Sequence, residues 1–588
     1  MKLSKLYMVA ALAGATLLTA CDDFIDVPPT GVINDDIAYS SPDEMVTAAY
    51  AMLGNCWYSY PFNLWPYGDV ASDDAMKGGS GVGDTGYHPF EVWSSLTNDR
   101  GELDELWYRL YCNISRCNRA LIALDAKGVE KLGEEKTTQR KAEVKFLRAH
   151  NYFKLLRIWY NVPWIDEKVV NDGSHEKINN FAEGKTDEQY NAELWQKVIA
   201  DLEEAYKVLP EAAPGTTGRA HKAAAAAYLA KIYLNLAYGD GYEKNNKQGK
   251  VNEEYLKKVL AYTEDVTKSG YDYLDDFGDI FLPDHKNSKE SVFAIQTSDY
   301  ESDGTKFGRA NWSNMLNGCW GIWSCGWDFN KPTMDLVNAF KTKDGLPDFD
   351  GWNKSDDYPV NGHANDQKWD PRLFHTVGMP TFPYKYEAQY TLTMDNSRNP
   401  GDYGYFASMK EVPQRSKGET FDQPWQAFDM NDYVFRYTDV MLWRAEALVE
   451  LGEPAQLAQA MDIINAIRLR AKASIGKHIA YAADQCDIAT YSSFPNQEYA
   501  RKAVRWERRL EMAMEHERFF DLRRWGVAST TLNAFFKHEA AAQYEGKNHA
   551  AYYNGAFFTT EKNEYWPIAY NQLYYVPGLY HQNRGYQN

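Results

Sequence analysis

Residues 433–452, YVFRYTDVMLWRAEALVELG, carry the pattern that decides the fold class of this chain. Their apolar stripe consists of Tyr437, Met441, Ala445 and Leu448. Spacings of three and four residues place such a stripe on one face of an α-helix. Gly452 follows directly, as is common where a helix ends. The pattern predicts a helix over residues 433–451.

Comparable helical patterns continue in both directions along the chain. Helices are predicted over residues 102–126, 141–160, 190–208, 221–238, 254–269, 455–473 and 497–525, and another begins near Ser41. Residues 221–238 are rich in alanine, which permits close helix packing, and such helix pairs resemble tetratricopeptide repeats. A mainly α-helical protein is therefore expected.

The helical pattern largely stops between residues 270 and 432. Only a short strand at 291–296 and a short helix at 332–340 are predicted there. An irregular region of this length inside a compact protein usually has a function. We therefore expect the functional site to involve this region, packed on the helical scaffold.

Residues 311–329, NWSNMLNGCWGIWSCGWDF, are the most distinctive part of the irregular region. Four of the 18 tryptophans of the chain lie in it: Trp312, Trp320, Trp323 and Trp327. The last three are spaced like one face of a helix, which is typical of core packing. Three glycines among them disfavour a helix. Two interpretations stay open: rings packed in the core, or a loop that displays flat apolar rings to a sugar or a peptide.

A second aromatic and polar segment covers residues 56–98. It contains Trp65, Tyr67, Trp93 and Asn98, together with the acidic stretch GDVASDD and Lys77. The alternation of aromatic and polar side chains disfavours a regular element and predicts a loop.

The N-terminus predicts export. Lys2 and Lys5 precede an apolar run over residues 6–20 that ends in LLTAC and is short for a transmembrane helix. The small residues before Cys21 resemble a bacterial lipobox, so residues 1–20 are predicted to be a signal peptide and Cys21 the lipidated first residue. Ordinary secretion with an unmodified Cys21 is the alternative. Residues 21–40 are then a tether, in which the acidic pair after Cys21 resembles the surface-export signal of Bacteroidetes lipoproteins.

Charge and motifs exclude several classes of function. The net charge of −19 disfavours nucleic acid and anionic membranes as partners and suits a neutral ligand. The chain has no Walker A, GxSxG or HExxH motif, and no CxxC pair, so no cofactor and no metal site are predicted. Cys319 and Cys325 either form a disulfide that braces the tryptophan-rich loop or are free thiols.

Residues 497–525 carry closely spaced charges of both signs. The spacing indicates ion pairs. A catalytic pair of carboxylates, as in a glycoside hydrolase, is the alternative. Every candidate carboxylate has an arginine nearby that would keep it ionised, so no enzymatic activity is predicted.

Several stretches of this chain resemble the SusD/RagB family of Bacteroidetes outer-membrane lipoproteins. They are CDDFIDV from Cys21, FLRAHNYFKLLRIWYNVPW from Phe146, KAAAAAYLAKIYLNLA from Lys222, YVFRYTDVMLWRAEALVELG from Tyr433, IRLRA from Ile467, WERRLEMAMEHERFFDLRRWG from Trp506 and the closing YWPI and QNRGY. The set occurs in order over almost the whole chain. Two small departures are Ala569, where a proline is frequent, and Asn161, where a glycine is common.

The resemblance implies a single SusD-like domain over residues 41–588. Four tetratricopeptide-like hairpins would form a scaffold over about 41–270 and 433–530, with an irregular ligand-binding lobe over about 271–432 and a closing segment over about 531–588. It also implies a lipid-anchored protein on the outer membrane, facing the cell exterior, that binds oligosaccharide or polysaccharide. Such a protein delivers its ligand to a SusC-like TonB-dependent transporter, without catalysis. A peptide-binding lid of a RagA-like transporter and a purely structural partner of the transporter are the alternatives.

In similar proteins, aromatic residues from two segments meet the ligand. The first segment corresponds here to Trp65, Tyr67, Trp93 and Asn98, and the second to Trp312, Trp320, Trp323 and Trp327. Three charged residues of the first segment either hydrogen-bond sugar hydroxyls or stabilise the loop: Asp73, Asp74 and Lys77.

Overall fold

The computed structural model describes residues 39–54, 63–212, 214–215, 217–239, 251–297, 316–323, 326–354, 367–416, 430–544 and 547–587. The predicted signal peptide, Cys21 and nearly all of the tether lie outside these ranges, so export and lipidation stay predictions. Among the helices in the described ranges, none combines the length and the apolar character that a membrane span requires.

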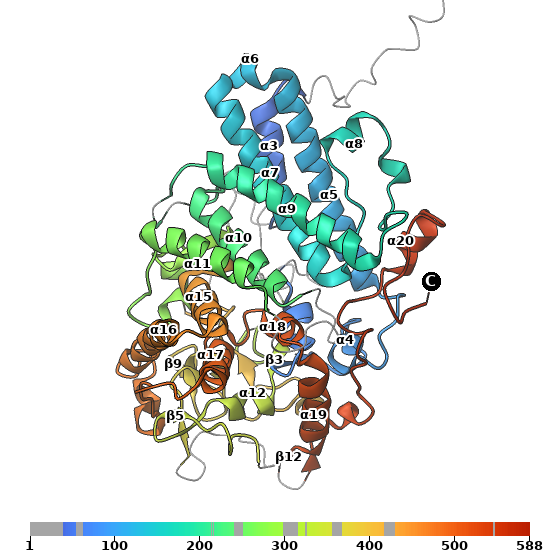
Figure 1. Ribbon diagram of the computed structural model, residues 1–588. Helices are drawn as coiled ribbons and strands as arrows, with labels where there is room; N and C mark the ends of the chain where they lie inside the picture. Colours follow the sequence, from blue (N-terminus) through green and yellow to red (C-terminus); the bar gives the residue numbers. More distant parts are fainter. Residues whose placement is uncertain are drawn as a thin grey trace, which may run out of the picture.

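Helices are the main elements of the described chain, which confirms the predicted mainly α class, and nine of them are long. They are α3 (Pro42–Ala51), α5 (Gly101–Ala123), α7 (Glu134–Trp159), α9 (Asp187–Val208), α10 (Lys222–Ala237), α11 (Glu253–Lys268), α15 (Tyr437–Leu451), α16 (Pro454–Ala473) and α17 (Gln497–Met512). Each packs on the next in this order up to α16, and α17 packs on α15. Figure 1 shows them stacked from α3, α5 and α7 at one end to α15, α16 and α17 at the other. The tetratricopeptide-like hairpins and the domain boundaries stay predictions.

Shorter helices and strand pairs occupy the rest of the described chain. The helices are α4 (His88–Val92), α6 (Val129–Leu132), α8 (Glu167–Asn171), α12 (Met334–Ala339), α13 (Leu373–Thr376), α14 (Pro400–Tyr403), α18 (Arg518–Arg524), α19 (Ala528–Ala541) and α20 (Tyr570–Tyr575). The antiparallel pairs are β1 (Ala75–Gly78) with β3 (Phe329–Pro332), β2 (Ser291–Ile295) with β11 (Asp432–Arg436), β7 (Val377–Gly378) with β10 (Ala407–Ser408), β8 (Pro383–Tyr384) with β9 (Glu387–Thr391), and β12 (Gln543–Tyr544) with β13 (Lys547–Asn548). β4 (Lys341–Lys343) lies between β5 (Leu346–Pro347) and β6 (Lys368–Trp369).

Two helix predictions were wrong at one end or in the middle. The predicted helix at 433–451 begins as strand β11, which pairs with β2, and only Tyr437 starts α15. The predicted helix at 497–525 is interrupted between α17 and α18. Met514 and His516 there have φ angles of 63° and 66°, which an α-helix excludes. The backbone N–H of His516 donates instead to Asp69, at 2.9 Å.

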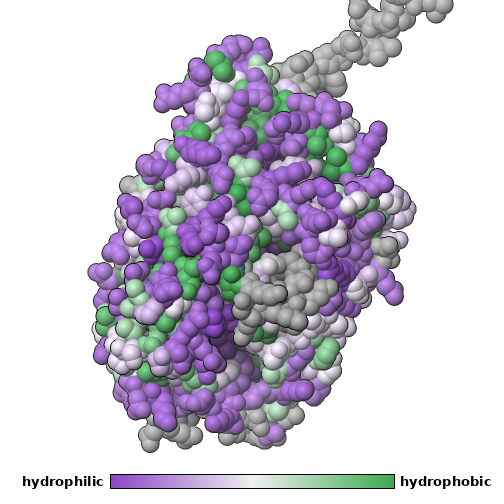
Figure 2. Space-filling model, in the orientation of Figure 1, coloured by the Kyte–Doolittle hydropathy of each residue, from purple (hydrophilic) through white to green (hydrophobic). Residues whose placement is uncertain are grey.

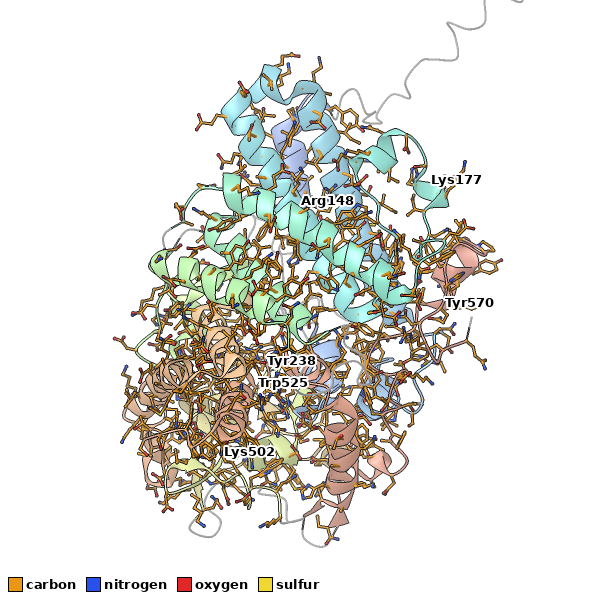
Figure 3. The ribbon with its side chains drawn as sticks, viewed as in Figure 1. Arg148, Lys177, Tyr238, Lys502, Trp525 and Tyr570 are labelled. Carbon is orange, nitrogen blue, oxygen red and sulfur yellow. The ribbon has the colours of Figure 1, made fainter. Side chains whose placement is uncertain are left out.

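The core contains buried ion pairs as well as apolar side chains. Figure 3 labels Tyr238 and Trp525, whose side chains meet at the buried Glu446. The Tyr238 hydroxyl and the Trp525 indole N–H donate to this carboxylate at 2.5 and 2.7 Å. The face of the molecule shown in Figure 2 is mostly hydrophilic, with separate smaller patches of hydrophobic residues.

Candidate functional site

The tryptophan-rich segment forms a loop in its described part and not a helix. Gly321 has a φ angle of 76°, which a helix does not allow. A Cβ atom on Gly326 would lie 2.2 Å from the carbonyl oxygen of Cys319. Cys319 is a buried free thiol among the described residues, and Cys325, its predicted partner, lies outside them. The glycines thus let the chain turn back closely on itself.

The loop buries one of its tryptophan rings in the core and exposes another to solvent. Trp320 has 41% of its surface exposed, whereas Trp323 has 2%. Trp327 is half-buried, and Trp312 lies outside the described residues. Trp323 packs in a cluster with Tyr384 of β8. Each of the two interpretations of the sequence therefore applies to a different ring.

Arg398 lies against both accessible rings. Its guanidinium carbon is 5.7 Å from the ring centre of Trp320 and 5.0 Å from that of Trp327. One guanidinium nitrogen is 3.2 Å from a carboxylate oxygen of Asp84. The backbone N–H of Arg398 donates to the buried Asp328 at 2.9 Å. Planar apolar faces and hydrogen-bonding groups thus lie side by side at the surface.

Asp84 is held as an anion in this arrangement. Burial raises its pKa, but hydrogen bonds from Ser80 and the charges of Lys77 and Arg398 outweigh that effect, so the pKa is lowered. The ammonium group of Lys77 donates to the carbonyls of Gly78, Gly81 and Asp84 at 3.0, 2.9 and 2.6 Å. Lys77 therefore shapes the loop that presents Asp84 to Arg398.

Amide side chains border the exposed ring. Asn396 donates to the carbonyl of Trp320 at 3.0 Å. Asn399 donates to the carbonyl of Ser80 at 3.1 Å and to Asp402 at 2.8 Å. All of these side chains are at least partly accessible to solvent. We call Trp320, Trp327, Asp84, Asn396, Arg398 and Asn399 the Trp320 surface.

The structure corrects the prediction for three aromatic residues of the first segment. Trp65, Tyr67 and Trp93 are each 1% exposed, which leaves no ring face for a ligand. Trp93 and Tyr67 both pack against Trp566, with ring centres 5.0 and 5.2 Å apart. These rings belong to the core that joins the first segment to the end of the chain.

Asn98 also contacts the end of the chain. Its side-chain amide donates to the carbonyl of Gln587 at 3.2 Å, and its own carbonyl accepts from Tyr570 at 2.8 Å. These hydrogen bonds give Asn98 a structural role within the described residues.

The two predicted segments nevertheless meet. Strand β1 lies within the first segment, where the sequence analysis predicted a loop, and pairs with β3, which begins at Phe329, the last residue of the tryptophan-rich segment. Trp65 lies edge-on to Phe329 at 6.1 Å between ring centres. The first segment therefore packs against the loop through β1 and Trp65, and it contributes Asp84 to the surface.

Two of the charged candidates of the first segment are buried in ion pairs. Arg509 is 2.9 Å from Asp74, and Arg518 is 2.7 Å from Asp73. Burial raises the pKa of both carboxyls, but the two arginines lower the pKa of Asp73 overall, while that of Asp74 stays raised. The loop-stabilising alternative is therefore favoured for both residues, as for Lys77.

The acidic residues of α17 and the turn after it are also paired. Glu511 contacts Arg372 and Arg436 at 3.1 and 2.9 Å. Although burial raises the pKa of Glu511 and Glu515, the neighbouring cations lower both overall. A carboxyl kept ionised in this way is a poor general acid, as the sequence analysis expected.

A cavity of about 570 Å³ lies along α17 and α18. It is lined by basic residues together with Trp506 and Trp525, and Figure 3 labels Lys502 at its rim and Trp525. Its arginines are paired, for example Arg501 with Glu450 at 2.7 Å. Trp525 is buried, whereas Trp506 is half-buried, so only one of the two rings is partly accessible from this cavity.

The sequence analysis missed Arg398, Asn396, Asn399 and Asp84. None of them has an aromatic or motif signal of its own. Arg398 is 314 positions from Asp84 along the chain, and Asn396 is 76 positions from Trp320. Only the fold brings these residues together.

Comparisons with known proteins give a consistent picture. The model of the SusD family matches residues 289–586, and a model described as starch-binding and associating with the outer membrane matches residues 67–234. A SusD-like protein of Bacteroides ovatus is 25% identical over 535 residues, which cover 89% of this chain and 82% of that protein.

Solved structures share the fold. A laminarin-binding SusD-like protein aligns with a TM-score of 0.64 at 21% identity, over 93% of this chain and 99% of its own. Surface glycan-binding protein A of Bacteroides thetaiotaomicron, solved in complex with laminarihexaose, aligns with a TM-score of 0.63 at 19% identity, over 92% and 98%.

Proposed function

This chain belongs to the SusD family, and on that premise we propose that it binds oligosaccharide or polysaccharide at the Trp320 surface. The observation that carries the proposal is the exposed ring of Trp320 beside the guanidinium of Arg398. Two structural neighbours, one of which binds laminarin while the other was solved in complex with laminarihexaose, support a glycan as the ligand class.

The chemistry of the surface suits a neutral glycan. The apolar face of a sugar ring stacks on an exposed indole, and each such contact contributes about 1 kcal/mol beyond the buried area. Arg398, Asn396 and Asn399 supply donors for sugar hydroxyls, and Asp84 supplies an acceptor. The net charge of −19 repels polyanions. Binding to one chain is expected to be modest, and several sites along a polymer raise it through avidity.

We further propose that the protein acts at the cell surface. Cys21 would carry the lipid that anchors it to the outer membrane, after removal of residues 1–20. The family model described as associating with the outer membrane supports this location. The ligand would then pass to a SusC-like TonB-dependent transporter, and the protein itself would carry out no reaction.

Affinity electrophoresis tests the glycan proposal. A soluble form that begins at Asp22 would migrate through gels that contain xylan, glucan, mannan or fructan, alongside the same form with Trp320→Ala. Tyr574→Ala is the matched control, because Tyr574 is an exposed aromatic residue of α20. We expect one polysaccharide to retard the wild type and the control but not Trp320→Ala.

Two outcomes contradict the proposal. Equal retardation of Trp320→Ala and the wild type removes the Trp320 surface as the binding site. Heat from a peptide mixture in calorimetry, without retardation in any gel, assigns the chain to peptide capture.

A further inference from the structure

We propose that Asp276, Asp279 and His478 form a binding site for a divalent transition-metal ion such as Zn²⁺. Each residue offers one ligand atom, and these atoms lie within 4.8 Å of one another. The Nε2 atom of His478 is 2.7 Å from Oδ1 of Asp279. This cluster is separate from the Trp320 surface and involves none of its residues.

Asp276 supplies the observation that points to a ligand. Its side chain is fully buried. Oδ1 accepts the backbone N–H of Gly278 at 2.7 Å, whereas Oδ2 has no hydrogen-bond partner in the part of the chain that the structure describes. A buried carboxylate oxygen without a partner is unfavourable. A cation between Asp276, Asp279 and His478 would satisfy it.

The donor set selects the kind of ion. Two carboxylates and one imidazole suit Zn²⁺ and its first-row neighbours, which accept nitrogen and oxygen ligands. Nε2 of His285 lies 4.0 Å from Oδ1 of Asp279 and is a further nitrogen close to the cluster. Calcium instead takes six to eight oxygen ligands, so the cluster fits it poorly.

The cluster is accessible to an ion from solvent. The side chains of Asp279 and His478 keep 22% and 29% of their surface exposed. Asp276 lies behind them. An ion can therefore approach past the imidazole and still leave one coordination position for water.

The surrounding structure holds the ligands in place. A Cβ atom on Gly278 would lie 2.6 Å from the Tyr386 hydroxyl and 2.7 Å from Nδ1 of His375. Only glycine fits at position 278, because any side chain there would clash with Tyr386 and His375. The ring of His478 stacks on Tyr386, with ring centres 4.7 Å apart and planes 19° apart. Rigid ligands of this kind are what a preformed metal site requires.

Metal binding would join two distant parts of the chain. Asp276 and Asp279 precede β2, whereas His478 follows α16 and is 199 positions from Asp279. No short motif can reveal such a set, and for that reason the sequence analysis predicted no metal site. Tyr386 also packs beside the cluster that contains Trp323, so the ion is expected to stabilise the lobe that carries the Trp320 surface.

Calorimetry on the chelator-treated chain from Asp22 tests the site, with ZnCl₂ and CaCl₂ titrated separately. We expect one Zn²⁺ per chain and a higher Tm in its presence. Asp276→Asn and Asp279→Asn should each weaken Zn²⁺ binding at least tenfold. Asparagine keeps an acceptor oxygen for Gly278. Asp275→Asn is the matched control, because its side chain is 89% exposed and lies next to the cluster; it should bind like the wild type.

Three results overturn the proposal. They are no saturable Zn²⁺ binding, Zn²⁺ binding that both variants retain, and a preference for Ca²⁺ over Zn²⁺. Circular dichroism establishes whether each variant is folded. If Asp276→Asn does not fold, then Asp279→Asn and His478→Gln decide the question.

Discussion

Arg524 and Glu446 form a buried bidentate ion pair in which both nitrogen–oxygen distances are 2.6 Å. Arg524 belongs to α18 and Glu446 to α15. Tyr238 and Trp525 donate to the same carboxylate. A single carboxylate thus joins three helical segments that lie far apart in the sequence.

Replacing Glu446 with Gln is expected to destabilise the protein at neutral pH. Burial raises the pKa of Glu446, but Arg524, followed by Arg505 and Tyr238, lowers it to about 2 overall. A folded-state pKa below the unfolded value means that the carboxylate contributes stability above about pH 4.5 and loses that contribution as the pH falls toward 2. The contribution at pH 7 is about 3 kcal/mol.

Urea unfolding at pH 7 and pH 3 measures this effect. The difference in unfolding free energy between wild type and Glu446→Gln should shrink at pH 3. Glu264→Gln is the control, because Glu264 pairs with Lys268 at the surface, and it should change stability by less than about 0.5 kcal/mol. A difference that does not depend on pH would contradict the ion-pair explanation.

Truncation of Trp93 to Ala should lower the stability of the protein, whereas truncation of Trp320 to Ala should lower its glycan binding. Trp93→Ala removes a fully buried indole and is expected to lower the free energy of unfolding by about 3–5 kcal/mol. Trp320→Ala removes a ring that is 41% exposed and should leave the Tm nearly unchanged while it abolishes glycan retardation. Thermal unfolding and affinity gels on the same two variants separate a packing role from a binding role.

Arg398 should contribute to glycan binding together with Trp320. Arg398→Ala is expected to weaken binding about fivefold, equivalent to about 1 kcal/mol. Arg398→Lys should not restore it, because an ammonium group lacks the planar face that lies against the rings. Arg116→Ala, which changes an exposed arginine of α5, is the control.

A double-mutant cycle by calorimetry checks this coupling. The loss in Trp320→Ala/Arg398→Ala should be smaller than the sum of the single losses, since the two side chains are in contact. Strict additivity would mean that Arg398 acts independently of the ring.

Glu539 should make stability fall as the pH rises. Its carboxylate oxygens accept the backbone N–H groups of Met334 and Asp335 at 2.8 and 3.2 Å. Burial is the main cause that raises its pKa to about 8. The folded state therefore holds a proton that the unfolded state releases above about pH 4.5, and the protein loses on the order of 1.4 kcal/mol per pH unit up to pH 8.

Thermal unfolding between pH 5 and pH 8 tests this titration. Glu539→Gln cannot lose a proton, so its Tm relative to the wild type should rise steadily across this range. A constant Tm difference would show that Glu539 does not titrate there.

The sequence predicted the helices well because helical spacing is a local signal. Alanine spacing and apolar stripes mark α10 and α15, and the structure has both. Strand β11 was not predicted, because its residues also fit the pattern of the helix that follows them. The break at Met514 and His516 has no glycine or proline to mark it, and the backbone N–H of His516 there donates to Asp69, which is distant in the sequence.

The candidate site was predictable only in part, for a physical reason. An exposed ring and a buried ring have the same composition, and only the tertiary fold distinguishes Trp320 from Trp65. Glycine content identified the loop because glycine acts on the local backbone. The polar neighbours of Trp320 come from separate segments, so no local pattern contains them.

The pairing of β1 with β3 and the packing of Trp93 on Trp566 restrict the stage at which the chain can fold. An N-terminal aromatic segment cannot complete its core until the last few dozen residues have been synthesised. Contacts of such long range slow folding and expose apolar surface in the meantime. The core that Trp93 shares with Trp566 can therefore form only when almost the whole chain is available, so removal of the residues from Trp566 onward should prevent the first segment from supporting the loop that carries Trp320.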